Sequence, residues 1–206
     1  TYYNPRRMNF GALRVLNDDR VEAGKGFGTH PHKNMEIISI PLKGKLKHGD
    51  SNKNSRTITI GDIQTMSAGT GIYHSEMNGS DTEPVEFLQI WVMPEKLNTP
   101  PAYRDYDIRP FLRKNELALI VSPDGDAPAK MLQQTWFSIG EIEAGKKIGY
   151  HMHQSHAGVY IFVIEGEVKV DDTVLSRRDG MGVYDTHSFE LETLKDSHIL
   201  LMEVPM

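Results

Sequence analysis

Two pairs of side chains in this chain have the residue types and the spacing of metal ligands. His30 and His32 stand at positions i and i+2, and His74 and Glu76 repeat that spacing further along the chain. In an extended strand, residues i and i+2 project to the same side, so each pair directs two donor groups toward one point. Three imidazoles and one carboxylate suit a divalent ion such as Fe(II), Ni, Mn, Cu or Zn and leave coordination positions open. We therefore predict a metal site made by His30, His32, His74 and Glu76.

Alternatives to this ligand set remain open at the level of the residues. Glu36 follows His32 by four residues, so on a regular strand it faces the same side and competes with Glu76 as the carboxylate ligand, ranked second. His30 and His32 could instead be solvated loop residues, with His74 an ordinary interior histidine. Three further histidines have no partner at a ligand spacing and are interpreted as surface or packed residues, namely His48, His156 and His198.

The composition limits the class of protein. The chain has 206 residues, with 28 acidic and 23 basic side chains and a formal charge of −5, which argues against direct nucleic-acid binding. It contains no cysteine, so disulfides, thiolate zinc sites and cysteine nucleophiles are excluded. The longest apolar runs are only as long as strands, so no membrane span is expected, and the predicted location is cytoplasmic.

The hydrophobic pattern predicts an all-β protein. Short apolar segments alternate with Gly, Asp, Asn and Pro, and the period of an amphipathic helix is scarce. The expected strands are Met35–Leu42, Lys45–His48, Arg56–Ile60, Asp62–Met66, Val85–Val92, Met131–Ile139, Val159–Glu165, Glu167–Val170 and Ser197–Val204. A proline-rich stretch, Met93–Tyr103, interrupts this series and marks the expected domain boundary.

The two sides of that boundary repeat one pattern. In the first half a glycine precedes His30 and His32, and an apolar run then ends at a turn containing Gly44. The second half has the same order, with His151 and His153 followed by a run that ends at Gly166. A shared register of this kind predicts a duplicated β domain. The second half lacks a His-x-Glu segment, because only Asp185 and His187 lie near the equivalent place, so no complete second metal site is expected there.

The same residues resemble a known family. The spacing of His30, His32 and Glu36, followed by Gly69, His74 and Glu76, is similar to the cupin motif pair, and the segments Met66–Glu76 and Gln89–Val92 resemble the pirin family closely. The resemblance covers nearly the whole chain. It implies a bicupin of two tandem jelly-roll β-barrels, with residues 1–100 as the N-terminal, metal-binding cupin domain and residues 101–206 as a C-terminal cupin domain.

The resemblance also implies an activity. It implies one divalent metal held by His30, His32, His74 and Glu76, with Fe(II) favoured over Ni, Mn, Cu, Co or Zn. It further implies a metal-dependent dioxygenase that takes a small aromatic substrate such as quercetin together with dioxygen. Glu76 is then expected to act catalytically as a general base when it leaves the metal. The alternatives are a metal-binding regulatory module that acts through a protein partner, and a non-oxidative cupin enzyme.

Overall fold

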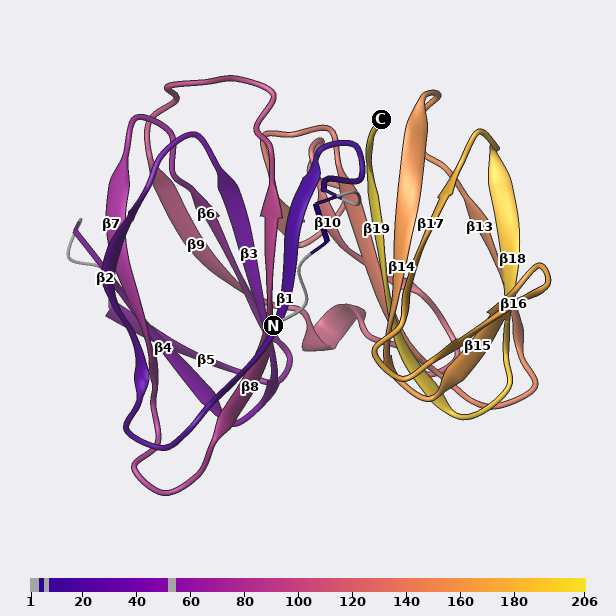
Figure 1. The fold of residues 1–206 in the computed structure, drawn as a ribbon, viewed down its shortest axis with the longest axis horizontal. Helices are drawn as coiled ribbons and strands as arrows, with labels where there is room; N and C mark the ends of the chain where they lie inside the picture. Colours follow the sequence, from indigo (N-terminus) through magenta and orange to yellow (C-terminus); the bar gives the residue numbers. More distant parts are fainter. Residues whose placement is uncertain (1–3, 6–7, 52–54) are drawn as a thin grey trace. The chain divides into compact units, whose positions relative to one another are not determined.

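The computed structural model describes residues 4–5, 8–51 and 55–206, and strands make up nearly all of its regular structure (Figure 1). In these ranges the helical element is a short 3-10 turn, η1 (Arg109–Phe111). The all-β class predicted from the sequence is therefore confirmed. The described residues contain no helix that is long and apolar enough to cross a membrane.

The chain separates into two compact units. The N-terminal unit comprises Leu13–Arg109 together with Ala129–Gln133, and the C-terminal unit holds the other described residues, chiefly Pro110–Pro128 and Gln134–Met206. Each unit contains strands from two sheets, and the candidate metal ligands all belong to the N-terminal unit.

Two antiparallel sheets build the N-terminal unit (Figure 1). The five-stranded sheet has the order β1-β8-β3-β6-β9, and the four-stranded sheet has the order β2-β7-β4-β5. The strands are β1 (Leu13–Val21), β2 (Gly26–His32), β3 (Glu36–Lys43), β4 (Lys45–Asp50), β5 (Ser55–Thr59), β6 (Asp62–Ser67), β7 (Ile72–Asn78), β8 (Val85–Val92) and β9 (Ala102–Asp107); the short β11 (Ala129–Lys130) also belongs to this unit.

The core of the N-terminal unit lies between its two sheets. One buried cluster combines Val21, Val85 and Phe87 of the five-stranded sheet with Leu46 and Ile58 of the four-stranded sheet. Burial of each such side chain stabilises the fold by about 1.5–3 kcal/mol relative to exposure. Because alternate residues of a strand face opposite sides, the polar residues in phase with these core residues also point inward.

The compact N-terminal unit continues past the boundary expected at residue 100. Strand β9 pairs along its length with β6, from Asp62 opposite Asp107 to Ser67 opposite Ala102. The proline-rich stretch is thus a connection within the unit. A further segment comes from the middle of the chain, where the backbone N–H groups of Leu132 and Gln133 donate hydrogen bonds to the carboxylate of Glu36, at 2.9 and 2.7 Å. No local pattern in the sequence predicts this contact between segments that are far apart in the chain.

The C-terminal unit has a similar arrangement of two sheets. Strands β10, β12, β19, β14 and β17 are successive neighbours in one sheet, and β13-β18-β15-β16 form the other. The strands are β10 (Ala118–Ser122), β12 (Trp136–Ile142), β13 (Lys147–His151), β14 (Ala157–Glu165), β15 (Glu167–Val170), β16 (Thr173–Ser176), β17 (Gly180–Tyr184), β18 (Ser188–Thr193) and β19 (Ser197–Pro205). The strand expected at Met131–Ile139 thus begins only at Trp136, because the residues before it turn toward Glu36.

The repeated strand–glycine–strand turn is present in both units. Gly44 and Gly166 have φ angles of +75° and +92°, which L-residues with side chains rarely adopt. A Cβ atom would also stand 2.6 Å from the Pro84 carbonyl oxygen at Gly44, and 2.3 Å from the Asp196 carbonyl oxygen at Gly166. The same steric need at both places accounts for the glycines that the sequence repeat shares.

Candidate metal centre

Three histidines of the N-terminal unit come together on the inner face of its four-stranded sheet. His30 and His32 lie on β2 and His74 on the neighbouring β7, and one ring nitrogen from each lies within 4.8 Å of the others. The register places His30 directly opposite His74, and their Nε2 atoms are 2.8 Å apart. The structure thus brings together the three imidazoles that the sequence singled out.

Strand alternation explains why these rings converge. On β7 the buried positions are Ile72, His74, Glu76 and Asn78, whereas Tyr73 between them is exposed. On β2 the exposed Pro31 separates His30 from the buried His32. Both i, i+2 pairs therefore project to the interior, and antiparallel pairing of the two strands sets His30 opposite His74, with Glu76 opposite Phe27.

The electrostatics of the cluster favour neutral imidazoles. Burial lowers the pKa of His32 to about 4, and the neighbouring His30 adds to that shift. Burial, followed by the effects of His30, His32 and His48, lowers the pKa of His74 to about 3. At neutral pH these rings are uncharged, so each keeps one nitrogen lone pair for coordination.

One nitrogen in this cluster has no hydrogen-bond partner. His32 Nε2 is buried and unpaired among the described residues. An unpaired buried polar atom costs about 1–3 kcal/mol, a cost that a bound cation would remove. Together with the close approach of His30 Nε2 and His74 Nε2, this unpaired nitrogen makes the donor set fit a divalent transition metal.

Glu76 is buried beside the cluster but is held by other side chains. Its Oε1 accepts a 3.2 Å hydrogen bond from the Ser39 hydroxyl, and its Oε2 accepts one from the Gln89 amide. Its oxygens are not part of the three-histidine group that lies within 4.8 Å. Burial raises the pKa of the Glu76 carboxyl, and the hydrogen bonds from Gln89 and Ser39 oppose that rise. Each oxygen accepts one hydrogen bond, so a lone pair remains on each oxygen for a metal.

The Gln89 amide links Glu76 to an aromatic wall. Its Oε1 accepts a 3.0 Å hydrogen bond from the indole N–H of Trp91, which fixes which end of the amide faces Glu76. The Trp91 ring meets the His32 ring edge to face, with centroids 4.9 Å apart. Gln89 and Trp91 therefore orient a carboxylate and an imidazole of the site at once, a role that sequence reasoning did not assign to them.

The competing carboxylate, Glu36, is engaged elsewhere. One of its oxygens accepts hydrogen bonds from the Ser67 hydroxyl and from the Leu132 backbone N–H, at 3.0 and 2.9 Å. The other accepts a 2.7 Å bond from the Gln133 backbone N–H. This buried carboxylate holds the 129–133 segment, and it is absent from the histidine group.

A fourth histidine belongs to the site, and sequence reasoning missed its connection. His48, interpreted as a surface or ordinary packed residue, is fully buried on β4, and its Nε2 lies 2.9 Å from His74 Nδ1. The usable signal was phase, because His48 stands two residues after the core residue Leu46 and so faces the same interior. His156 is exposed and His198 is partly buried, in line with their interpretation as surface or packed residues.

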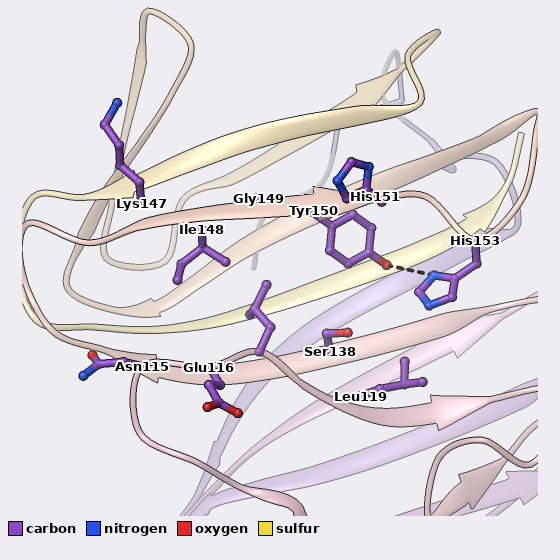
Figure 2. A pocket seen from close by; sticks show the side chains of 11 residues that line it. Asn115, Glu116, Leu119, Ser138, Lys147, Ile148, Gly149, Tyr150, His151 and His153 are labelled. Atoms are coloured by element: carbon purple, nitrogen blue, oxygen red, sulfur yellow. Dashed lines mark hydrogen bonds between the residues drawn. The ribbon is translucent and has the colours of Figure 1, made fainter.

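The histidine pair of the C-terminal unit is arranged differently (Figure 2). Tyr150 is buried and the next residue, His151, is exposed on the other side of β13. His153 lies beyond the end of the strand, where its Nδ1 is 2.8 Å from a carboxylate oxygen of the fully buried Glu203. The His153 ring also stacks on Trp136, with centroids 5.0 Å apart and planes 4° from parallel.

Glu203 is surrounded by donors. Its Oε2 also accepts a 2.8 Å hydrogen bond from the Tyr150 hydroxyl, and its Oε1 accepts bonds from the backbone N–H groups of His153 and Gln154, at 2.8 and 3.2 Å. The carboxylate therefore holds the loop that follows β13. A cavity of about 530 Å³ is lined by Tyr150, His151 and His153, among other residues. Asp185 and His187, the expected counterparts of the second ligand pair, are exposed and do not line it.

Comparison with protein families gives two separate matches, one in each half of the chain. The family model named Pirin matches residues 1–92, and the model described as the quercetinase C-terminal cupin domain matches residues 119–204. The two matches fall on the two halves that the sequence repeat separates.

Individual relatives match over nearly the full chain. The chain is 39% identical to a quercetin 2,3-dioxygenase of Escherichia coli strain K12, across 99% of this chain and 87% of that protein. It is 34% identical to a pirin-like protein of Caulobacter vibrioides, across 98% of this chain and 88% of that protein. A crystal structure of the bacterial pirin YhhW from Escherichia coli in complex with nickel(II) superposes with a TM-score of 0.92, at 36% identity, covering 99% of this chain and 87% of that one.

Proposed function

The chain belongs to the pirin family, and on that premise we propose that it is a metal-dependent dioxygenase that acts on a flavonol such as quercetin. The family and the two-sheet architecture of both units confirm the bicupin fold class. The observation that carries the proposal is the convergence of three imidazoles on the inner face of a sheet, in a chain that is 39% identical to a quercetin 2,3-dioxygenase.

We assign the metal ligands within the N-terminal unit. His30, His32 and His74 supply the three nitrogens, and the unpaired Nε2 of His32 supports the presence of a cation among them. Glu76 supplies the carboxylate oxygen, because it projects from β7 to the same interior as His74, two residues away. A bound divalent metal supplies Lewis acidity and open coordination positions to an enolic hydroxyl and to dioxygen.

The protein's own groups prepare the substrate. Glu76 accepts the hydroxyl proton of the flavonol on a carboxylate oxygen, and burial, which raises the pKa of this carboxyl, makes it a stronger base. Ser39 and Gln89 hold the carboxylate in place before and after that transfer. The Trp91 ring, packed against His32, gives an apolar wall that excludes water from the site.

Fe(II) is proposed as the resident metal, with Ni, Mn, Cu, Co and Zn as the other candidates for this nitrogen-rich site. A pirin of Escherichia coli holds nickel(II) in its crystal structure, which supports a divalent transition metal in the family fold. Metal analysis of freshly purified protein identifies the ion. The cytoplasmic location and a protein partner stay predictions.

The direct test is oxygen uptake with quercetin. The metal-free protein is reconstituted anaerobically with Fe(II), Ni, Mn, Cu or Co in turn, and oxygen consumption is followed after addition of quercetin. Uptake with at least one metal is expected. Bound metal without uptake, together with partner capture that depends on His30 and His74, would indicate the regulatory module, and turnover without oxygen would indicate a non-oxidative cupin enzyme.

The role of Glu76 is tested by Glu76→Gln. This change keeps the size and a hydrogen-bonding oxygen but removes the base, so turnover should fall about 100-fold or more. Metal content is measured in parallel, to separate loss of the base from loss of a ligand. Full turnover in Glu76→Gln would remove Glu76 from the mechanism.

A further inference from the structure

We propose that His48 is a positioning residue that fixes the tautomer of His74, so that His74 presents Nε2 to the metal. The proposal rests on the metal site described above. It goes beyond that site because His48 is no ligand, and its spacing in the sequence does not connect it to the other histidines.

The geometry places His48 behind His74. His48 projects from β4 into the same interior, where the register sets it opposite Glu76. Its Nε2 lies 2.9 Å from His74 Nδ1, on the side of the His74 ring away from His30. No other hydrogen bond to His74 Nδ1 is found among the described residues, so His48 is the group that meets this nitrogen.

The proton positions follow from the hydrogen bonds. His30 Nδ1 lies 2.8 Å from the Gly28 carbonyl oxygen, which only accepts, so His30 carries its proton on Nδ1 and its Nε2 holds a lone pair. For His74 Nε2, 2.8 Å away, to be a ligand as well, the proton of His74 must be on Nδ1. His48 Nε2 must then accept that N–H, which places the proton of His48 on its own Nδ1.

The surroundings of His48 hold its ring without fixing its proton. The ring stacks on Tyr103 of β9, with centroids 4.4 Å apart and planes 13° from parallel. The Tyr103 hydroxyl is in turn hydrogen-bonded by the Gln64 amide. His48 Nδ1 is buried and has no hydrogen-bond partner among the described residues, so no outside group imposes a tautomer.

The same rings therefore suit both states of the site. Without metal, His48 Nε2–H donates to His74 Nδ1, and His74 Nε2–H donates to His30 Nε2, so every close contact is a hydrogen bond. With metal, the protons of His48 and His74 each move from Nε2 to Nδ1 of the same ring, and the number of protons on the rings is unchanged. His48 accepts in one state and donates in the other, which an amide or a carboxylate cannot do at one atom.

The test compares two variants by their affinity for Ni(II). His48→Leu removes the acceptor and keeps an apolar side chain against Tyr103, so affinity should fall about 10–100-fold, the range for loss of a hydrogen-bond partner behind a ligand. His48→Gln offers an amide oxygen near the place of Nε2 and should restore most of that affinity. His198→Leu, in the C-terminal unit, is the matched control and should leave affinity unchanged. Circular dichroism verifies that each variant is folded; if His48→Leu is not, the tautomer of His74 in the metal-loaded wild type decides.

A second readout reports the tautomer itself. Long-range ¹H–¹⁵N correlation spectra of the Zn(II)-loaded protein should show His74 protonated on Nδ1 and coordinated through Nε2. Coordination through Nδ1, or equal Ni(II) affinity in His48→Leu and wild type, would overturn the proposal, as would failure of the wild type to bind metal. A protein that binds Ni(II) as described but does not consume oxygen with quercetin would refute the proposed activity and leave the role of His48 standing.

Discussion

The N-terminal and C-terminal units carry the same histidine pair but place it differently. In the N-terminal unit, His30 faces the interior and pairs across the sheet with His74. In the C-terminal unit, the residue that faces the interior from β13 is Tyr150, and His151 faces outward opposite Ser188. A shift of one residue exchanges the two faces of a strand, so the same His-x-His spacing directs His30 to the interior in one unit and His151 outward in the other.

The units also use their buried carboxylates differently. Glu76 accepts one hydrogen bond on each oxygen, from the side chains of Ser39 and Gln89, and each oxygen keeps a lone pair. Glu203 accepts from two backbone N–H groups as well as from Tyr150, and it faces the imidazole of His153. The first carboxylate is available for chemistry, whereas the second holds a loop in position.

The largest expected difference between the units is in metal content. We predict one metal per chain, bound in the N-terminal unit. His74→Ala should weaken binding by more than about 100-fold, since even partners behind a ligand contribute about 10–100-fold, whereas His153→Ala should leave metal content unchanged. Both variants should remain folded, because the apolar core stabilises each unit. Two metals per chain, or equal losses in the two variants, would contradict the comparison.

The next difference is in stability. Glu203→Gln removes the charge that faces His153 and one acceptor for its buried donors, so the free energy of unfolding should fall by about 1–3 kcal/mol. Metal content should not change. Urea denaturation measures the first and metal analysis the second. A stable Glu203→Gln variant with reduced metal content would mean that this carboxylate serves the metal site after all.

Acid should affect the metal-free N-terminal unit more than its counterpart. The pKa values of His32 and His48 are lowered to about 4 and that of His74 to about 3. Between about pH 6.5 and pH 4 the unfolded chain binds protons that the folded unit does not. The free energy of unfolding therefore decreases as the pH is lowered, by at most about 1.4 kcal/mol per pH unit for each histidine. Glu76 has the opposite effect, because its pKa is raised in the folded unit. Above the ordinary pKa of a glutamate, the folded unit binds a proton there that the unfolded chain does not, and this offsets part of the loss of stability.

Hydrogen exchange resolved by segment measures this acid effect in each unit. Protection of β7 should decrease more than protection of β18 when the metal-free protein is moved from pH 7 to pH 5, after correction for the intrinsic exchange rates. Equal losses in both strands would show that the buried histidines do not govern the acid response.

The smallest expected effect is that of a substitution that gives the C-terminal unit a second cross-strand histidine pair. Ser188→His sets an imidazole opposite His151, in the register that His30 and His74 have. No second metal should bind, because His151 faces away from the interior. Metal analysis of this variant decides the point, and a second equivalent of metal would show that pairing across the strands, without regard to the face, suffices to make a site.

The sequence by itself determined the fold class and the projection of each proposed ligand pair to one side of its strand. Alternation along β7 places His74 and Glu76 on one face whatever the neighbouring strand is, since the period of two belongs to the backbone. The glycines at the repeated turns likewise reflect a local need, the positive φ of Gly44 and Gly166. Such features depend on a few consecutive residues, so they can be read before the fold is known.

Only the tertiary structure decided which side chains meet. His48 acts on His74 because β4 lies beside β7, and Tyr103 supports it because β9, beyond the proline-rich stretch, pairs with β6. The outward direction of His151 follows from the phase of β13 relative to its core, which the motif alone does not contain. Strand neighbours and strand phase are set by packing between distant segments, so no local pattern specifies them.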